Sequence, residues 1–315
     1  MTSTTEPIDL RRSRDFGEQV NVTVAFIRQN YRKLGRSVVS IAGATILANA
    51  LVTFVLLIFP YLSFAAGGEG LEQMESTVTI AGTLLQFLLY GVVLIQIICA
   101  VNAYVMLYLE HGADGFGVED VQRESKKKFW LIARTLLMLW LLTAFLLAFG
   151  KGWLASGGLI RLMMGVAMIS VVARFIVRLI PIFSVMFHEQ EAFSDAMDRC
   201  KELMENRWWF TFGLILLFYV LVIVMMLLLE LPAYLILWSK EFDPYLGGEW
   251  LLTIPVVALS LLSSLVGTAG LALPVIAGTL HYFNLVEKTD GTGTMQRIDT
   301  IGAEPGAVNL ETPVS

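Results

Sequence analysis

The chain has 315 residues, of which 56% are hydrophobic and only 16% are charged, and its formal net charge is −5. With a mean hydropathy of +0.70, it lies outside the range of soluble globular domains and is typical of integral membrane proteins. The charge is too mild to indicate a nucleic-acid partner. Cys99 lies in an apolar run and Cys200 in a polar segment, so the two cysteines give no disulfide framework.

The N-terminal segment, residues 1–36, is polar and basic. It holds seven lysines and arginines and no apolar stretch, so we expect no cleaved secretory signal here and a cytosolic location. Its apolar residues nevertheless recur at helical spacing, which predicts an amphipathic helix with one apolar stripe. That stripe consists of Phe16, Val20, Ile27, Tyr31 and Leu34.

Residues 37–288 are predicted to form a six-helix transmembrane domain, and the predicted fold class is an all-α integral membrane protein. A span needs about 20 predominantly apolar residues to cross a hydrocarbon core of about 30 Å. Residues 289–315 are polar and aperiodic, which predicts a disordered cytosolic tail. The stretches long enough to span are 37–66, 77–109, 129–150, 153–187, 208–238 and 250–285.

Lysine and arginine are distributed unevenly between the two sides of these spans. Sixteen lie in the N-terminal segment, the second and fourth connections and the tail, whereas only Lys151 and Lys240 lie on the other side. Since basic residues favour the cytoplasmic side, both termini are predicted to be cytoplasmic in a cell inner membrane.

Amphipathic cytosolic helices are predicted before spans one, three and five. In EAFSDAMDRCKELMEN, apolar residues recur at helical spacing opposite acidic and basic ones, and VEDVQRESKKKFW is a weaker example. Each polar segment ends in a basic and aromatic cluster, which marks the inner membrane interface. The unequal spacing of the three clusters leaves open whether the units arose by duplication.

The sequence gives no catalytic motif. His111, His188 and His281 lie at or near cytosolic helix ends, and no metal-ligand or nucleophile spacing is present. We therefore expect a protein that is not an enzyme and that holds no cofactor or metal. The alternative is an acid–base or metal site at the inner face. Its candidate residues are Glu110, His111, Asp114, His188, Glu189 and Glu191.

Three arginines occur in RLMMGVAMISVVARFIVRLIP, within the fourth predicted span. Arg161 lies near its outer end. Glu230 is predicted at the same level, because it lies about 33 Å along the fifth span. We predict an ion pair between Arg161 and Glu230 at the outer interface. Arg174 and Arg178 are four residues apart and share a helix face, so they are predicted to contact lipid headgroups or substrate near the inner leaflet.

The last predicted span is interrupted by small residues and a proline. Close helix packing with a proline kink is the expected role, and a broken helix at a binding site is the alternative. These residues are Gly267, Gly270, Pro274 and Gly278. Other polar side chains inside the spans are Asn49, Gln86, Gln96, Asn102 and Arg134.

The run AFSDAMDRCKELMENRWWF before the fifth span resembles a unit of the membrane domain found on some bacterial glycerophosphodiester phosphodiesterases. It is also similar to uncharacterised bacterial six-helix membrane proteins, and the closing HYFNLVEK looks like the end of the last span in Bacteroidetes members of that set. The resemblance covers about residues 15–300. It implies a location and an architecture without an activity, because the enzymes' catalytic barrel begins with a His-Arg-Gly tripeptide that this sequence does not contain.

These patterns predict a non-catalytic, multi-pass inner-membrane protein with a membrane-associated scaffolding role or a role in binding lipids or partners. The expected partners are the bilayer and its anionic headgroups, a cytosolic protein or a second copy of the chain; nucleic acid is not expected. The alternative is a transporter of small solutes or lipids that uses Arg174, Arg178 and the interrupted last helix.

Overall fold

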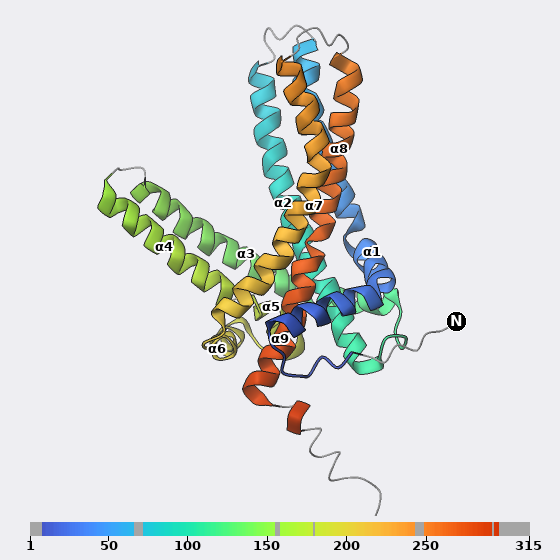
Figure 1. The fold of residues 1–315 in the computed structure, drawn as a ribbon, viewed down its shortest axis with the longest axis vertical. Coiled ribbons are helices and arrows are strands. Elements are labelled where there is room, and N and C mark those ends of the chain that lie inside the picture. Colours follow the sequence, from blue (N-terminus) through green and yellow to red (C-terminus); the bar gives the residue numbers. More distant parts are fainter. Residues whose placement is uncertain are drawn as a thin grey trace, which may run out of the picture.

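The computed structural model describes residues 8–65, 72–154, 158–178, 180–242, 249–291 and 293–295. All regular structure in these ranges is helical (Figure 1), which confirms the predicted all-α class for the described part of the chain. The helices are α1 (Phe16–Ala65), α2 (Glu72–His111), α3 (Val118–Leu154), α4 (Leu159–Arg178), α5 (Ile182–His188), α6 (Phe193–Leu203), α7 (Trp208–Phe242), α8 (Glu249–Gly270) and α9 (Ala272–Asp290).

Helices α1, α2, α7 and α8 lie side by side in a bundle (Figure 1). Large apolar side chains such as Leu51, Leu84 and Leu228 are exposed on the bundle surface. Such a surface suits contact with lipid, because apolar side chains are the favourable ones in a bilayer core. Four helical stretches are long and apolar enough to cross a membrane: Phe16–Phe59, Ser76–His111, Trp208–Ile236 and Ile254–Asp290.

Helices α3 and α4 form a second hairpin that leans away from this bundle (Figure 1). The hairpin packs on α2 through Gly91, where a Cβ atom would lie 2.4 Å from the Trp140 ring. It meets the start of α7, where the Arg174 guanidinium lies 5.5 Å from the centre of the Trp208 ring. Part of the predicted fourth span, 153–187, lies outside the described residues, so six spans remain a prediction.

Two predicted spans are interrupted in the structure. The fourth, 153–187, contains the separate helices α4 and α5, and Pro181 directly precedes α5. The last, 250–285, contains α8 and α9, which meet at Leu271; this residue keeps helical backbone angles, so the interruption is limited to one residue. Proline lacks the backbone N–H that would continue the hydrogen-bond ladder, so Pro274 removes one bond just after this break.

The polar segments predicted before spans one and three are continuous with the helices that follow them, since α1 and α3 run through the predicted boundaries. In contrast, α6 is a separate helix. Its Ala196, Cys200 and Leu203 side chains are buried, and Asp198 and Lys201 are exposed. Thus α6 packs against the protein through one apolar face.

The largest group of buried side chains includes residues from α1, α2, α5, α6 and α9. We call the end of the molecule where α5, α6 and the end of α9 lie the basal end (Figure 1). Here the N-terminal segment lies against α9. The Asn284 Oδ1 atom accepts a hydrogen bond of 2.8 Å from the Arg14 amide, and Asn284 Nδ2 donates one of 3.3 Å to the Arg14 carbonyl. The Tyr108 hydroxyl accepts a bond of 2.8 Å from the Ile8 amide.

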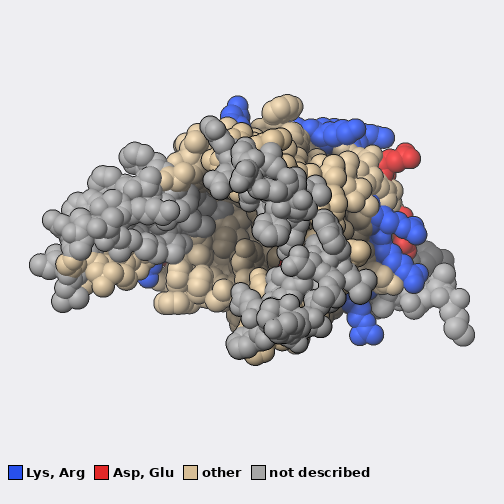
Figure 2. All heavy atoms as spheres, turned by 90° about the horizontal axis from the view of Figure 1, so that it is seen from above, with Lys and Arg blue, Asp and Glu red and all other residues tan. Residues whose placement is uncertain are grey.

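The described lysine and arginine side chains gather mostly along one margin of the molecule in Figure 2. This margin is on the side where α1 lies in Figure 1. Few acidic side chains are seen among them in this view. On the face seen in this view, basic charge is therefore concentrated along one side.

Candidate functional site

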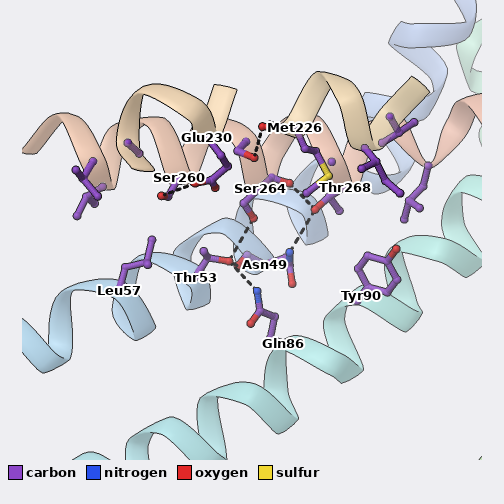
Figure 3. A pocket seen from close by; sticks show the side chains of 18 of the residues that line it. Asn49, Thr53, Leu57, Gln86, Tyr90, Met226, Glu230, Ser260, Ser264 and Thr268 are labelled. Carbon is purple, nitrogen blue, oxygen red and sulfur yellow. Dashed lines mark hydrogen bonds between the residues drawn. The ribbon is translucent and has the colours of Figure 1, made fainter. Parts of the chain in front are cut away.

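A band of polar side chains joins α1, α2 and α8 inside the four-helix bundle (Figure 3). Asn49 and Thr53 on α1 are one helical turn apart and therefore share a face. Ser260, Ser264 and Thr268 form a similar row on α8, since they are also spaced at four residues. These two rows face each other and line a common cavity.

Hydrogen bonds connect the facing rows. Asn49 Nδ2 donates to the Thr268 hydroxyl at 3.4 Å, and the hydroxyls of Thr53 and Ser264 lie 3.3 Å apart. Gln86 on α2 adds a bond of 2.9 Å from Nε2 to the Thr53 hydroxyl. Inter-helix hydrogen bonds of this kind help membrane helices to associate, at about 0.6–2 kcal/mol each.

Glu230 on α7 supplies a carboxyl group to the same cavity (Figure 3). The Ser260 hydroxyl donates a hydrogen bond of 3.4 Å to this carboxyl group. The cavity has a volume of about 560 Å³, and none of its described lining residues is a lysine, arginine or histidine. Aromatic side chains, among them Tyr90 and Tyr219, and aliphatic ones complete the lining. The cavity therefore combines one acidic group with hydroxyls, amides and apolar surface.

Asn49 leaves one hydrogen-bond acceptor unused. Its side chain is only 3% exposed, and its Oδ1 atom has no hydrogen-bond partner although its Nδ2 atom bonds Thr268. A buried polar atom without a partner costs about 1–3 kcal/mol. A ligand or water that donates a hydrogen bond to Asn49 would remove this cost.

Two glycines allow α8 to approach α7 beside the cavity. A Cβ atom at Gly267 would lie 2.5 Å from Met226 Sδ, and one at Gly270 would lie 2.9 Å from Val222 Cγ1. The close packing expected from small residues is therefore present at these two positions. The adjoining break at Leu271 also lines the cavity.

The residues singled out in the sequence are located in different parts of the fold. Glu230 lines the cavity. Arg161 belongs to α4, but its side chain lies outside those described, so its pairing with Glu230 remains a prediction. Arg174 and Arg178 are exposed, and neither lines the cavity. Arg174 instead contacts the Trp208 ring.

The two histidines of the alternative acid–base or metal site, His111 and His188, lie in different environments. His111 is exposed, with Nδ1 3.9 Å from the Glu110 carboxylate. His188 packs between the rings of Tyr282 and Phe283, at centroid distances of 5.7 and 4.9 Å. Burial, with a smaller effect from Arg11, lowers the pKa of His188 to about 4. Among the described residues, no group of three or more His, Cys, Asp or Glu side chains could hold a metal ion.

The sequence showed Asn49, Gln86 and Glu230 as separate polar residues within spans, and the structure brings them together in one cavity. The serines and threonine of α8 were missed. Their four-residue spacing, which matches that of Asn49 and Thr53, was the signal that could have shown two facing polar rows.

Comparisons with protein-family models, with curated proteins and with solved structures find no match to this chain. The resemblance to the membrane domain of glycerophosphodiester phosphodiesterases therefore remains a prediction, and functional inference rests on the geometry of the cavity.

Proposed function

We propose that this chain is a non-catalytic, six-span protein of a bacterial inner membrane that binds a small amphiphilic ligand within the membrane. The observation that carries the proposal is the Glu230 carboxyl group, which faces a cavity lined by hydroxyls and amides inside helices apolar enough to cross a bilayer. Both termini are proposed to lie in the cytoplasm.

The position of Glu230 within a membrane-spanning helix supports a binding role. It lies about 33 Å along α7 from Trp208, toward the predicted outer end of the span, and ionisable side chains within such segments are rare and commonly mark ligand, ion or proton sites. The cavity volume of about 560 Å³ also lies within the range of small-molecule sites, about 300–1,000 Å³. A purely structural helix contact would need neither the charge nor the space.

Ligand capture provides the experiment. The full chain is purified in mild detergent, and bound lipids and metabolites are identified by mass spectrometry. In Ser264→Leu, a larger apolar side chain enters the cavity, so we expect at least a tenfold loss of the bound compound. Leu262→Phe is the control, because Leu262 is exposed on the same helix. Equal ligand content in wild-type protein and Ser264→Leu would contradict the proposal.

The six-span arrangement needs its own test. It is supported by the length and exposed apolar surface of the α3–α4 hairpin and by the strong excess of lysine and arginine on one side of the predicted spans. Reporter fusions after residue 315 and within residues 155–157 should give cytoplasmic and periplasmic signals, respectively. The same signal at both positions would exclude a membrane-crossing α4.

Transport of the bound ligand is a second candidate function, because the break between α8 and α9 adjoins the cavity at Leu271. Interrupted helices at binding sites are common in transporters. Reconstituted liposomes should then accumulate the compound that mass spectrometry identifies. Binding without uptake would leave the protein as a receptor or lipid-binding scaffold.

Arg174 and Arg178 are proposed to contact anionic lipid headgroups at the inner interface. Their support is exposure on one face of α4 and the position of Arg174 beside Trp208, because tryptophan and arginine both favour the headgroup layer. Replacing both arginines with glutamine should lower the amount of phosphatidylglycerol that copurifies, without changing occupancy of the cavity.

A further inference from the structure

We infer that the cavity between α1, α2, α7 and α8 binds an amphiphilic organic amine, whose ammonium group pairs with Glu230. This inference rests on the proposed ligand-binding function and names the chemical class of the ligand. The ammonium group can belong to the headgroup of an aminolipid or to a free amine.

The charge of the site is the first reason. A carboxylate offers about four lone-pair positions to donors, and the described donor to Glu230 is the Ser260 hydroxyl at 3.4 Å. None of the described residues that line the cavity carries a positive side chain. Glu230 is half-buried, and a charge held in the bundle, away from bulk water, is stabilised by a partner of opposite sign, so a cation from outside this lining is the group that fits.

The shape of the molecule favours a ligand over Arg161 as that cation. Helix α4 belongs to the hairpin that leans away from the bundle (Figure 1). Helix α4 contacts α7 where the Arg174 guanidinium, near the end of α4, lies over the ring of Trp208, the first residue of α7. Glu230 lies 22 residues further along α7, about 33 Å at 1.5 Å per residue.

The size of the cavity favours an organic cation over a metal ion. A bound Ca²⁺ collects six to eight oxygens at about 2.3–2.6 Å, and Mg²⁺ demands a compact octahedral shell. The described residues hold no cluster of three metal-ligating side chains, and about 560 Å³ is available. Aliphatic lining residues such as Leu57, Val222 and Val256 offer a surface for the apolar body of the ligand.

The unused acceptor at Asn49 adds a second requirement. Asn49 bonds Thr268, whereas Glu230 bonds Ser260, eight residues earlier on α8. The two α8 residues that they bond are therefore about 12 Å apart along the helix axis, which sets the approximate length of a ligand that reaches both side chains. A chain that carries an ammonium group at one end and a donor such as a hydroxyl at the other satisfies both Glu230 and Asn49 Oδ1.

Isothermal titration of the purified full chain tests the inference with two probes of matched length, 8-amino-1-octanol and 1,8-octanediol. The amine should bind at least about tenfold more tightly than the diol, because hydrogen bonds to charged groups are the stronger ones. Glu230→Gln should remove that preference, whereas the control Glu205→Gln, at an exposed position of the basal end, should keep it. Equal affinity of the wild-type chain for the two probes overturns the inference even if Glu230→Gln does not fold.

Ser264→Leu separates failure of the inference from failure of the proposed function. If Ser264→Leu blocks both probes while Glu230→Gln retains the preference for the amine, the cavity binds ligands but Glu230 does not select them. If Ser264→Leu has no effect on either probe, the proposed binding function itself fails. If Arg161→Glu restores the thermal stability lost in Glu230→Arg, Arg161 is the partner of Glu230 and the inference is overturned.

Nanodiscs distinguish the two sources of the amine. If the natural occupant is an aminolipid, phosphatidylethanolamine in the nanodisc competes with the probe. The apparent affinity for 8-amino-1-octanol should then be at least about tenfold weaker than in phosphatidylglycerol nanodiscs. A free amine as the natural ligand predicts equal affinity in both. Either result supports binding of an amine, provided that the preference over the diol is present.

Discussion

Replacing Asn284 with alanine should weaken the attachment of the N-terminal segment to α9 while leaving the bundle folded. Asn284 is fully buried and holds the Arg14 amide at 2.8 Å and the Arg14 carbonyl at 3.3 Å. Loss of the acceptor from a buried amide costs about 1–3 kcal/mol, and the second bond adds about 1 kcal/mol. Since Lys288 also donates to the Arg14 carbonyl, we take about 2 kcal/mol as the expected loss.

Trypsin provides the assay, because Arg11 and Arg12 are exposed residues of this segment. If cleavage requires local opening that is fast compared with proteolysis, a loss of about 2 kcal/mol should raise the cleavage rate roughly 30-fold. Mass spectrometry of the N-terminus measures that rate, and thermal unfolding checks that the rest of the chain remains folded.

Asn284→Asp is the matched variant for this experiment. It keeps an oxygen acceptor for the Arg14 amide, and Lys288 still donates to the Arg14 carbonyl. Cleavage should therefore stay within about threefold of the wild-type rate. The reasoning is refuted if Asn284→Ala is cleaved at the wild-type rate, or if the alanine and aspartate variants are cleaved equally fast.

Other changes test the basal end and the packing of the hairpin. His188 is held neutral by burial, with its pKa lowered to about 4, so folding stability should be full above pH 6.5 and fall by about 2 kcal/mol at pH 5. Denaturation of the wild-type chain and of His188→Gln at both pH values should show a loss that is larger by about 2 kcal/mol in the wild type. Gly91→Ala should lower stability by about 1–3 kcal/mol, because the new Cβ meets the Trp140 ring; Gly35→Ala, which meets no atom within 4 Å, is the control in thermal unfolding. Burial raises the pKa of the Cys200 thiol to about 12, so maleimide should label Cys200 only after unfolding, and rapid labelling of the native chain would contradict its burial.

The helical class could be predicted from the sequence because long apolar runs leave a membrane-spanning backbone few alternatives to the helix. Helix continuity was harder to predict. Hydropathy does not distinguish the uninterrupted α1 from the interrupted α8 and α9, which are separated at Leu271. Local signals were present in Pro181 and Pro274, but whether a proline bends or ends a helix depends on its neighbours in the fold.

The cavity could be predicted only in part. Counting residues from the start of α7 estimates the depth of Glu230 without showing which helix it faces. The structure adds this information, because Ser260 on α8 donates to Glu230 and Asn49 on α1 reaches Thr268 on α8. Such contacts depend on the rotation and pairing of helices distant in sequence, so one-dimensional periodicity identifies the polar faces but not their partners.

Because the N-terminal segment contacts Asn284, it can reach its final position only after nearly the whole chain has been synthesised. The two residues are 270 positions apart, and synthesis proceeds at about 5–20 residues per second. A ribosome would therefore need roughly 15–50 s after making Arg14 before Asn284 is polymerised. Throughout that interval the N-terminal segment lacks its final binding surface, so a protease or chaperone that recognises the open segment would act on nascent chains and spare completed ones.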